Sequence, residues 1–283
     1  MNESFYRKIR NILAEGGIED SEFTAKVIIS HFSGLTFTEC TFKAEADFSD
    51  DIRNNILYAV ERRLGNEPLQ YIIGEWDFMD FTFNVGEGVL IPRPETEMLC
   101  EYVVDRIKHK QNPVVYDLCS GSGCIGLSIK KYVPQCEIFL VEKSEKALEY
   151  LCRNASRICK DTFLTIVKGN VFDIKSFAGH PKADVIVSNP PYIRTNEISF
   201  LQKEVQFEPS LALDGGADGL DFYRCLTSEW KKMLKKDGFM AFECGEDQGN
   251  DISLLFSENG FDSEIIKDYN NLDRIVIGRR KTK

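Results

Sequence analysis

The chain has 283 residues, 43% of them hydrophobic and 28% charged, so it can form one large domain or a main domain with a smaller companion, and it is too apolar to be disordered. Its 35 basic and 45 acidic residues give a net charge of −10, which disfavours a protein that binds a nucleic acid duplex. The N-terminal segment lacks a continuous apolar stretch, so we expect a cytoplasmic protein with neither a signal peptide nor a membrane span.

The cysteines and histidines point to neither disulfides nor a metal. The nine cysteines are odd in number and include no CxxC pair, so we expect them to be reduced and mostly buried. His31, His109 and His180 lie far apart and have no neighbouring ligands at zinc-site spacing. The sequence therefore predicts no metal site.

The first part of the chain is predicted to be helical. Apolar residues recur at helical spacing through residues 1–75, for example Phe5, Ile9 and Leu13, with charges between them. Residues 76–89 are aromatic and β-branched and contain a Gly-Glu-Gly turn, which predicts a β-hairpin. Two prolines in residues 90–97 predict an extended loop and the start of a helix, and we expect a hinge there.

From Val114 onward, predicted strands and helices alternate. This pattern favours an α/β fold with a parallel sheet covered by helices on both faces. The short connection between the last two strands predicts an antiparallel hairpin at the sheet edge. We therefore expect a helical domain over 1–75, a linker with a hairpin and a connecting helix over 76–110, and a main domain over 111–283. The predicted strands are 114–118, 137–141, 163–168, 183–188, 238–244, 263–267 and 273–278, and the predicted helices are 123–132, 144–159, 219–236 and 246–258.

A glycine-rich turn follows the first of these strands. Gly121, Gly123 and Gly126 match the pattern GxGxxG between a strand and a helix, and Glu142 ends the second strand. In this context the glycines let a nucleoside cofactor approach the backbone closely, and the acidic side chain accepts hydrogen bonds from ribose hydroxyls. The turn therefore predicts an adenosine-type ligand.

The glycine pattern alone does not separate a dehydrogenase from a methyltransferase. A dehydrogenase places a pyrophosphate at this helix N-terminus, whereas a methyltransferase holds the methionine part of S-adenosylmethionine there. Asp117, just before the turn, favours the methyltransferase, because a carboxylate repels a pyrophosphate and attracts ammonium and sulfonium charges. The alternative is that Asp117 only caps the following loop.

The fourth predicted strand ends in Asn189, Pro190, Pro191 and Tyr192, at the end of a parallel strand where open α/β sheets place their active sites. A planar amide or amino nitrogen attacks a methyl group only when its lone pair is freed from conjugation. The Asn189 side-chain oxygen and the Pro190 carbonyl can accept its two N–H groups, the prolines keep these acceptors rigid, and the Tyr192 ring can pack on the substrate. These residues predict catalytic methylation of such a nitrogen.

Together these motifs resemble the bacterial-type release factor glutamine methyltransferases over nearly the whole chain. The segments that carry the resemblance are PLQYIIG at 68–74, LIPRPETE at 90–97, DLCSGSGCIG at 117–126, SNPPYI at 188–193, and EP at 208–209 followed by LALDGGADGL at 211–220. The NPPY turn alone also occurs in DNA adenine methyltransferases, so the combination carries the resemblance.

The resemblance implies a seven-stranded, Rossmann-like class I methyltransferase domain with a small N-terminal helical domain and a β-hairpin linker. It implies methyl transfer from S-adenosylmethionine, with S-adenosylhomocysteine as product, to the side-chain amide nitrogen (N5) of the GGQ glutamine in class I peptide chain release factors. The helical domain would help to grip the release factor, and the 92–95 loop would form part of the site wall.

The resemblance also assigns individual residues. Cys119, Glu142 and Asn170 stand where the family has glycine, aspartate and an acidic residue, and Asn170 can still accept a hydrogen bond from the adenine amino group. The substrate amide would be held by Asn189, Pro190, Pro191 and Tyr192. The cofactor residues are Asp117, from its charge, and, from the matched motifs, Cys119, Ser120, Gly121, Ser122, Gly123, Glu142, Asn170, Val171 and Asn189.

Other functions remain as alternatives. Nucleic acid adenine or cytosine N-methylation uses a similar pocket for a flipped base, but the short span after the NPPY turn and the net charge leave little room for a duplex-reading module, so no direct nucleic acid partner is expected. The chemistry does not distinguish glutamine methylation of a ribosomal protein. A cofactor-binding scaffold or a dehydrogenase would not need the NPPY turn.

Two further charged residues have open roles. Glu243 ends a predicted buried strand and is expected to be structural. Arg93 can contact the cofactor carboxylate or pair with Glu95 or Glu97, and the sequence favours neither.

Overall fold

The computed structural model describes residues 4–160 and 163–281, which form two compact units. The smaller unit comprises the chain up to Glu75 together with Gln202–Phe207, and the larger comprises Trp76–Leu201 and the chain from Glu208 onward. No helix among the described residues is long and apolar enough to cross a membrane.

The smaller unit is helical, as predicted. Its longest helix, α4, begins after Ser49, whose hydroxyl accepts a hydrogen bond from the backbone N–H of Ile52. Arg63 of α4 is buried and forms an ion pair with Glu204, which ties the 202–207 segment to this unit. The helices are α1 (Phe5–Glu15), α2 (Ser21–Ser33), α3 (Phe37–Cys40), α4 (Asp50–Leu64) and α5 (Leu69–Ile73), with a 3-10 turn at Glu45–Asp47.

A two-stranded hairpin, β1 (Glu75–Phe78) and β2 (Phe81–Asn84), precedes the large sheet, and α6 (Pro94–Ile107) follows it. Proline at the first position of α6 suits a helix start, because its missing N–H would have no partner there. The hairpin was predicted. Residues 90–93, expected to form a hinge, instead lie inside the larger unit.

The large sheet has seven strands in the order β5-β4-β3-β6-β7-β9-β8, which confirms the predicted seven-stranded α/β fold. Strands β3 to β7 are parallel, while β9 is antiparallel to both β7 and β8, so the final hairpin lies at the edge as predicted. The strands are β3 (Val114–Leu118), β4 (Glu137–Glu142), β5 (Thr165–Lys168), β6 (Ala183–Ser188), β7 (Leu234–Glu243), β8 (Phe261–Lys267) and β9 (Asp273–Arg280).

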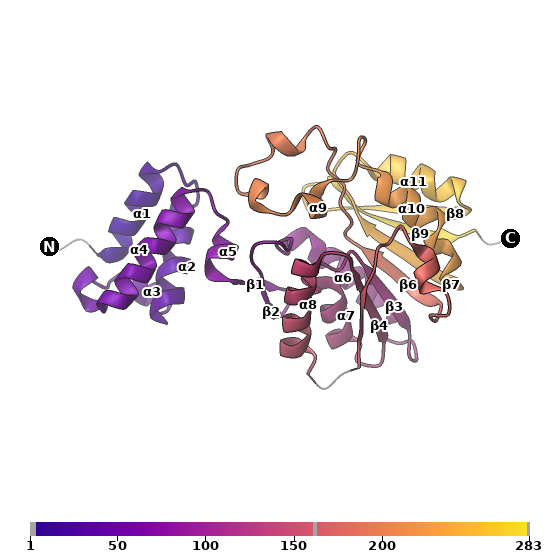
Figure 1. Cartoon of the computed structure of the whole chain (residues 1–283), viewed down its shortest axis with the longest axis horizontal. Coiled ribbons are helices and arrows are strands. Elements are labelled where there is room, and N and C mark those ends of the chain that lie inside the picture. The colour runs from indigo at the N-terminus through magenta and orange to yellow at the C-terminus, as the bar shows by residue number, and fades with distance from the viewer. Residues whose placement is uncertain (1–3, 161–162, 282–283) are drawn as a thin grey trace. The chain divides into compact units, whose positions relative to one another are not determined.

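Helices cover both faces of this sheet (Figure 1). One core cluster joins α6, α7 and α8 to one face, and the other joins α10 and α11 to the opposite face, around Tyr116, Tyr223 and Trp230. All five residues of β3 are buried, as a central parallel strand requires. The remaining helices are α7 (Cys124–Tyr132), α8 (Glu145–Ile158), α9 (Ser210–Leu213), α10 (Asp221–Ser228) and α11 (Gly249–Glu258), with 3-10 turns at Ile174–Phe177, Ile198–Phe200, Val205–Phe207 and Trp230–Lys232.

One predicted element is wrong in extent. A helix was expected over 219–236, but α10 ends at Ser228 and β7 already begins at Leu234. Leu234 pairs with Ala183 of β6, and the Ala183 N–H donates to the Met233 carbonyl at 2.7 Å. These pairings draw the chain into the sheet although its apolar spacing still fits a helix.

Candidate active site

The glycine turn and the Asn189 turn leave the sheet side by side. Leu118, the last residue of β3, is paired with Ser188, the last residue of β6, and the Ser188 hydroxyl donates to the Leu118 carbonyl at 2.6 Å. The chain runs outward from β3 to β4 in one direction and from β6 to β7 in the other. This is a topological switch point, where open α/β sheets bind their ligands.

A cavity opens at this point. It encloses about 960 Å³, a volume that includes the open space at its mouth. Its walls come from segments far apart in the sequence, all within the larger unit. The lining residues are Gly88–Arg93, Thr96, Cys119–Ser122, Cys124, Ile125, Val141–Ser144, Ala147, Gly169–Phe172, Asn189, Pro191, Pro209, Leu211, Ala212 and Phe222.

Glycine is required at positions 121, 123 and 126 for different structural reasons. A side chain at Gly121 would point into nearly open space, since only Val89 lies as close as 4.0 Å, so this glycine leaves room beside the backbone. A Cβ at Gly123 would lie 2.3 Å from Leu151, and one at Gly126 would lie 2.6 Å from Leu140. The last two glycines therefore allow α7 to pack closely, and the first shapes the cradle.

Cys119 has a backbone φ of +60°, in the left-handed region that glycine favours. The conformation explains why glycine suits this position and why a cysteine there is strained. Ser120 helps to hold it, because its hydroxyl donates to the Asp117 carbonyl at 2.7 Å. The turn therefore keeps its shape despite the cysteine.

Asp117 lies behind the turn and does not line the cavity. Its Oδ2 accepts the Gly126 N–H at 2.9 Å, while its Oδ1 is buried and has no hydrogen-bond partner among the described residues. Burial raises the pKa of Asp117 to about 8. Without ligand the group is largely protonated near neutral pH, and the geometry matches the capping alternative rather than direct contact with a cofactor.

Glu142 and Asn170 line the cavity, but each also braces the backbone. Glu142 Oε2 accepts the Gly121 N–H at 2.8 Å, and Oε1 accepts the N–H groups of Lys143 and Ser144 at 2.8 and 2.7 Å. Asn170 Oδ1 accepts the Phe172 N–H at 3.1 Å. Since a carboxylate oxygen has two lone pairs, Glu142 Oε2 keeps capacity for a further donor, such as a hydroxyl.

Asn189 and Pro191 line the cavity, whereas Pro190 is buried. Tyr192 is partly buried and packs against the core cluster that contains Tyr223 of α10. Asn189 Nδ2 donates to the Thr96 hydroxyl at 3.3 Å. Burial raises the pKa of Tyr192 above its usual range, so its hydroxyl stays protonated. The turn thus offers an amide side chain at the cavity and an apolar support behind it.

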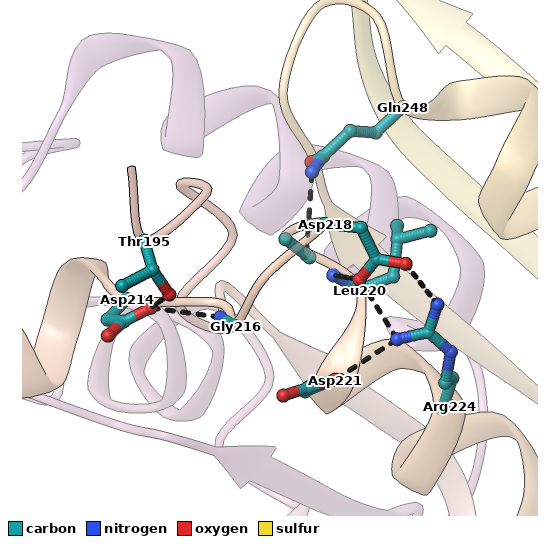
Figure 2. A network of polar contacts seen from close by, with 9 residues as sticks. Thr195, Asp214, Gly216, Asp218, Leu220, Asp221, Arg224 and Gln248 are labelled. Atoms are coloured by element: carbon teal, nitrogen blue, oxygen red, sulfur yellow. Dashed lines mark hydrogen bonds and ion pairs between the residues drawn. The ribbon is translucent and has the colours of Figure 1, made fainter. Parts of the chain in front are cut away.

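Gln248, just before α11, connects this turn to residues 214–220, the segment after α9. Gln248 Nε2 donates to the Tyr192 carbonyl at 2.9 Å and also reaches the Gly219 carbonyl. Figure 2 shows how the same segment is held by its aspartates: Asp214 accepts the Thr195 hydroxyl, and Asp218 forms an ion pair with Arg224. Gln248 therefore joins the end of the Asn189 turn to Gly219 of the segment after α9.

A buried carboxylate fixes the 90–93 wall. Glu208 Oε2 accepts the Ile91 N–H at 2.9 Å, and Oε1 forms an ion pair with Arg93. The sequence left open whether Arg93 contacts the cofactor carboxylate or pairs with Glu95 or Glu97. In the structure its ion-pair partner is Glu208, and Glu97 instead accepts the Met79 N–H at 2.6 Å. Burial raises the pKa of Glu208 although Arg93 opposes the shift.

Glu243, the last residue of β7, is 1% exposed, and burial raises its pKa to about 7. Its Oε2 is buried and has no hydrogen-bond partner among the described residues. The residue does not line the cavity. It therefore lies beneath the site rather than in it.

The structure brings most of the expected residues to one cavity. Cys119 to Ser122, Glu142, Asn170, Val171, Asn189 and Pro191 line it, while Asp117, Gly123, Pro190 and Tyr192 lie behind the lining. Sequence reasoning missed the supporting roles of Thr96, Glu208 and Gln248. Thr96 and Glu208 stand in segments that carried the family resemblance, which is the only signal that marks them.

Comparison with known proteins gives a consistent result along the chain. Residues 5–74 match the family model "PrmC N-terminal domain" and residues 95–206 match "Methyltransferase small domain". A release factor glutamine methyltransferase of Clostridium acetobutylicum is 41% identical over 97% of this chain and 95% of its own length, and one of Thermodesulfovibrio yellowstonii is 40% identical over 95% and 96%.

Solved structures agree on the fold. A methyltransferase from Pyrococcus furiosus, 18% identical, superposes with a TM-score of 0.53 over 83% of this chain and all of its own. Similarity at that identity supports the fold alone, whereas the full-length relatives define the family. The chain therefore belongs to the release factor glutamine methyltransferases.

Proposed function

We propose that this protein transfers a methyl group from S-adenosylmethionine to the side-chain amide nitrogen (N5) of the glutamine in the GGQ motif of class I peptide chain release factors. The observation that carries the proposal is the pairing of Leu118 with Ser188, which opens the glycine turn and the Asn189 turn into one cavity. A cofactor methyl and a planar amide would meet there. A cytoplasmic location follows from this substrate, since release factors act in translation.

The residues present fit the cofactor. Open space beside Gly121 leaves room for a ligand against the backbone, Glu142 offers acceptor capacity for ribose hydroxyls, and Asn170 and Val171 stand at the wall assigned to adenine. Phe172 and Phe222 extend this wall with apolar surface; their rings meet edge to face, with 4.9 Å between the ring centroids. When bound, S-adenosylmethionine supplies an electrophilic methyl group; Asp117 supports the cradle from behind.

The Asn189 turn would hold the substrate amide. The Asn189 Oδ1 and the Pro190 carbonyl accept the two N–H groups of the glutamine side chain and stabilise the positive charge that develops on its nitrogen. Proline rigidity and the Gln248 bond to the Tyr192 carbonyl keep these acceptors in place, so little reorganisation is needed. No strong general base is required, because the methylated nitrogen is acidic.

The substrate class is tested by supplying labelled S-adenosylmethionine with a class I release factor, the same factor with its GGQ glutamine changed to alanine, a mixture of ribosomal proteins, and duplex DNA. We expect label only on the unmodified release factor, because the full-length relatives bear that specificity in their names. Label on DNA or on a ribosomal protein, with none on the release factor, would overturn the proposal.

A further inference from the structure

A buried asparagine in α8 joins the end of the hairpin to the glycine turn. Asn154 is 0% exposed, and its side-chain amide makes four hydrogen bonds. Its Oδ1 accepts the Asn84 backbone N–H at 2.7 Å and the Asn84 side-chain amide at 3.0 Å. Its Nδ2 donates to the carbonyls of Asn84 and Ser122, at 3.1 and 2.9 Å. Asn154 therefore ties the last residue of β2 to a residue of the cavity wall.

Backbone partners fix the orientation of this amide. The Asn84 backbone N–H can only donate, and the carbonyls of Asn84 and Ser122 can only accept. The Asn154 oxygen must therefore face the N–H group, and its NH2 group must face the two carbonyls. An ionised aspartate could not replace it, because a carboxylate has no donor for the carbonyls.

The 85–89 segment, which follows β2, lies along the same face of α8. Three residues of α8, spaced four apart, share that face: Lys146, Tyr150 and Asn154. A Cβ at Gly86 would lie 2.2 Å from the Tyr150 hydroxyl oxygen, and one at Gly88 would lie 2.8 Å from Lys146 Cβ. The two glycines therefore let this segment lie directly against the helix.

Val89 brings this segment to the cavity. It is 0% exposed, and its Cγ2 lies 4.0 Å from the place that a Cβ at Gly121 would take. Gly88 and Val89 line the cavity together with Gly121 and Ser122 of the glycine turn. Val85 belongs to the same core cluster as Val89 but does not line the cavity. The segment and the glycine turn are therefore adjacent parts of one wall.

We propose that Asn154 and Val89 are positioning residues for the cofactor. Asn154 holds the glycine turn and the start of the 85–89 segment at one point of α8, and Val89 supports the turn at Gly121. Neither residue takes part in the chemistry, since each acts through the shape of the turn. The inference deepens the proposed function and rests on it, because it concerns the site assigned to S-adenosylmethionine.

A purely structural role for these two residues predicts a different result. If they only fastened the hairpin to α8, replacing them would lower stability and leave the affinity for cofactor unchanged. The positioning role predicts weaker cofactor binding, because only molecules with a correctly shaped turn can bind. It also predicts an unchanged KM for release factor at saturating cofactor, since the Asn189 turn follows a different strand and is held by Gln248.

The valine test compares Val89→Ala with Val85→Ala. Both valines are buried in one cluster, so both variants should lose similar stability in urea unfolding. Val89→Ala should raise the calorimetric Kd for S-adenosylmethionine by about fourfold, the contribution of one methyl group packed against the turn. Val85→Ala should leave this Kd unchanged.

The asparagine test compares Asn154→Ala with Asn259→Ala. Asn259 also joins separate elements, since its Nδ2 donates to the Leu255 carbonyl at 2.9 Å and its Oδ1 accepts the Lys231 ammonium at 2.9 Å, but neither partner lines the cavity. Asn154→Ala should raise the cofactor Kd by about twofold to tenfold, the effect of one net hydrogen bond. Asn259→Ala should lose stability and keep the wild-type Kd.

Cofactor binding is measured without release factor, so this test is separate from the test of the substrate. An unchanged Kd in Val89→Ala or in a folded Asn154→Ala protein, or an equal rise in the matched control, would overturn the positioning role. If both variants behave as expected while the wild-type protein methylates no release factor, the proposed substrate fails and the positioning role stands. A wild-type protein that binds no S-adenosylmethionine would overturn both.

Discussion

Replacing Gly215 with alanine should damage the substrate turn directly. The added Cβ would lie 2.7 Å from Tyr192 Cα and 2.9 Å from both the Pro191 and Gly219 carbonyl oxygens. All three contacts are backbone atoms, so no flexible side chain can move aside. Ordinary contacts between such atoms are about 3.5–4.0 Å, and the Asn189 turn must therefore move by about 1 Å.

This displacement sets the expected magnitude. Overpacking of this kind costs about 1–3 kcal/mol of stability. A reacting group displaced by about 1 Å can lose about 100-fold in rate. The glycine turn follows a different strand, so we expect Gly215→Ala to lower kcat by about 100-fold and to leave the cofactor Kd nearly unchanged.

The assay compares kcat for release factor methylation with the calorimetric Kd for S-adenosylmethionine, and Gly179→Ala is the control. Gly179 has φ +97° and open space around it, so alanine costs about 1–2 kcal/mol of backbone strain without touching the site. The control should lose stability and keep its kcat. A Gly215→Ala protein with normal kcat, or with equal losses of kcat and cofactor affinity, would refute the reasoning.

Three further variants test the supports around the cavity. Glu208→Gln removes the ion pair with Arg93, so it should lower the free energy of unfolding by about 2 kcal/mol and raise the Kd for the cofactor. Urea unfolding and calorimetry measure these two quantities. No change in either would contradict the role of Glu208 in fixing residues 90–93. Asn154→Leu removes the donor to the Ser122 carbonyl at 2.9 Å, so the turn should bind cofactor more weakly, and an unchanged Kd would argue against that support. Burial raises the pKa of Asp117 in the folded protein to about 8, whereas the unfolded value is about 4. The folded state therefore binds this proton more tightly. The stabilisation that the Asp117 proton provides falls as pH rises from about 4 to 8. Asp117→Asn should make the loss of stability between about pH 5 and pH 8 smaller by at least about 1 kcal/mol, and an equally steep pH dependence in urea unfolding would rule out the raised pKa.

The sheet could be predicted from the sequence because its strands are local signals. Runs such as VVYDL at β3 are mostly apolar and buried on both faces, as central parallel strands are, and the glycine turn marks where a strand is followed by a helix. The end of α10 could not be predicted, because Trp230 and Leu234 continue a helical spacing. Pairing with Ala183 decides the structure there, and such a partner is not visible locally.

In the candidate site, too, some residues could be predicted from local sequence and others could not. Residues that touch the cavity stand in turns whose composition is unusual, so Cys119, Glu142 and Asn189 could be named in advance. Their supports are ordinary residues whose partners lie far along the chain: Glu208 is 115 residues from Arg93, and Gln248 is 56 from Tyr192. The charge of Asp117 predicts contact with the cofactor, but the residue is completely buried, and burial depends on packing that is not visible in the local sequence.

The most direct measurement is tandem mass spectrometry of a class I release factor after incubation with this protein and S-adenosylmethionine. The account predicts one added methyl group on the side-chain amide nitrogen of the GGQ glutamine with the wild-type protein, and almost none with Asn189→Ala, although that variant still binds the cofactor. A methyl group on another residue, or full methylation of the glutamine by Asn189→Ala, would contradict it.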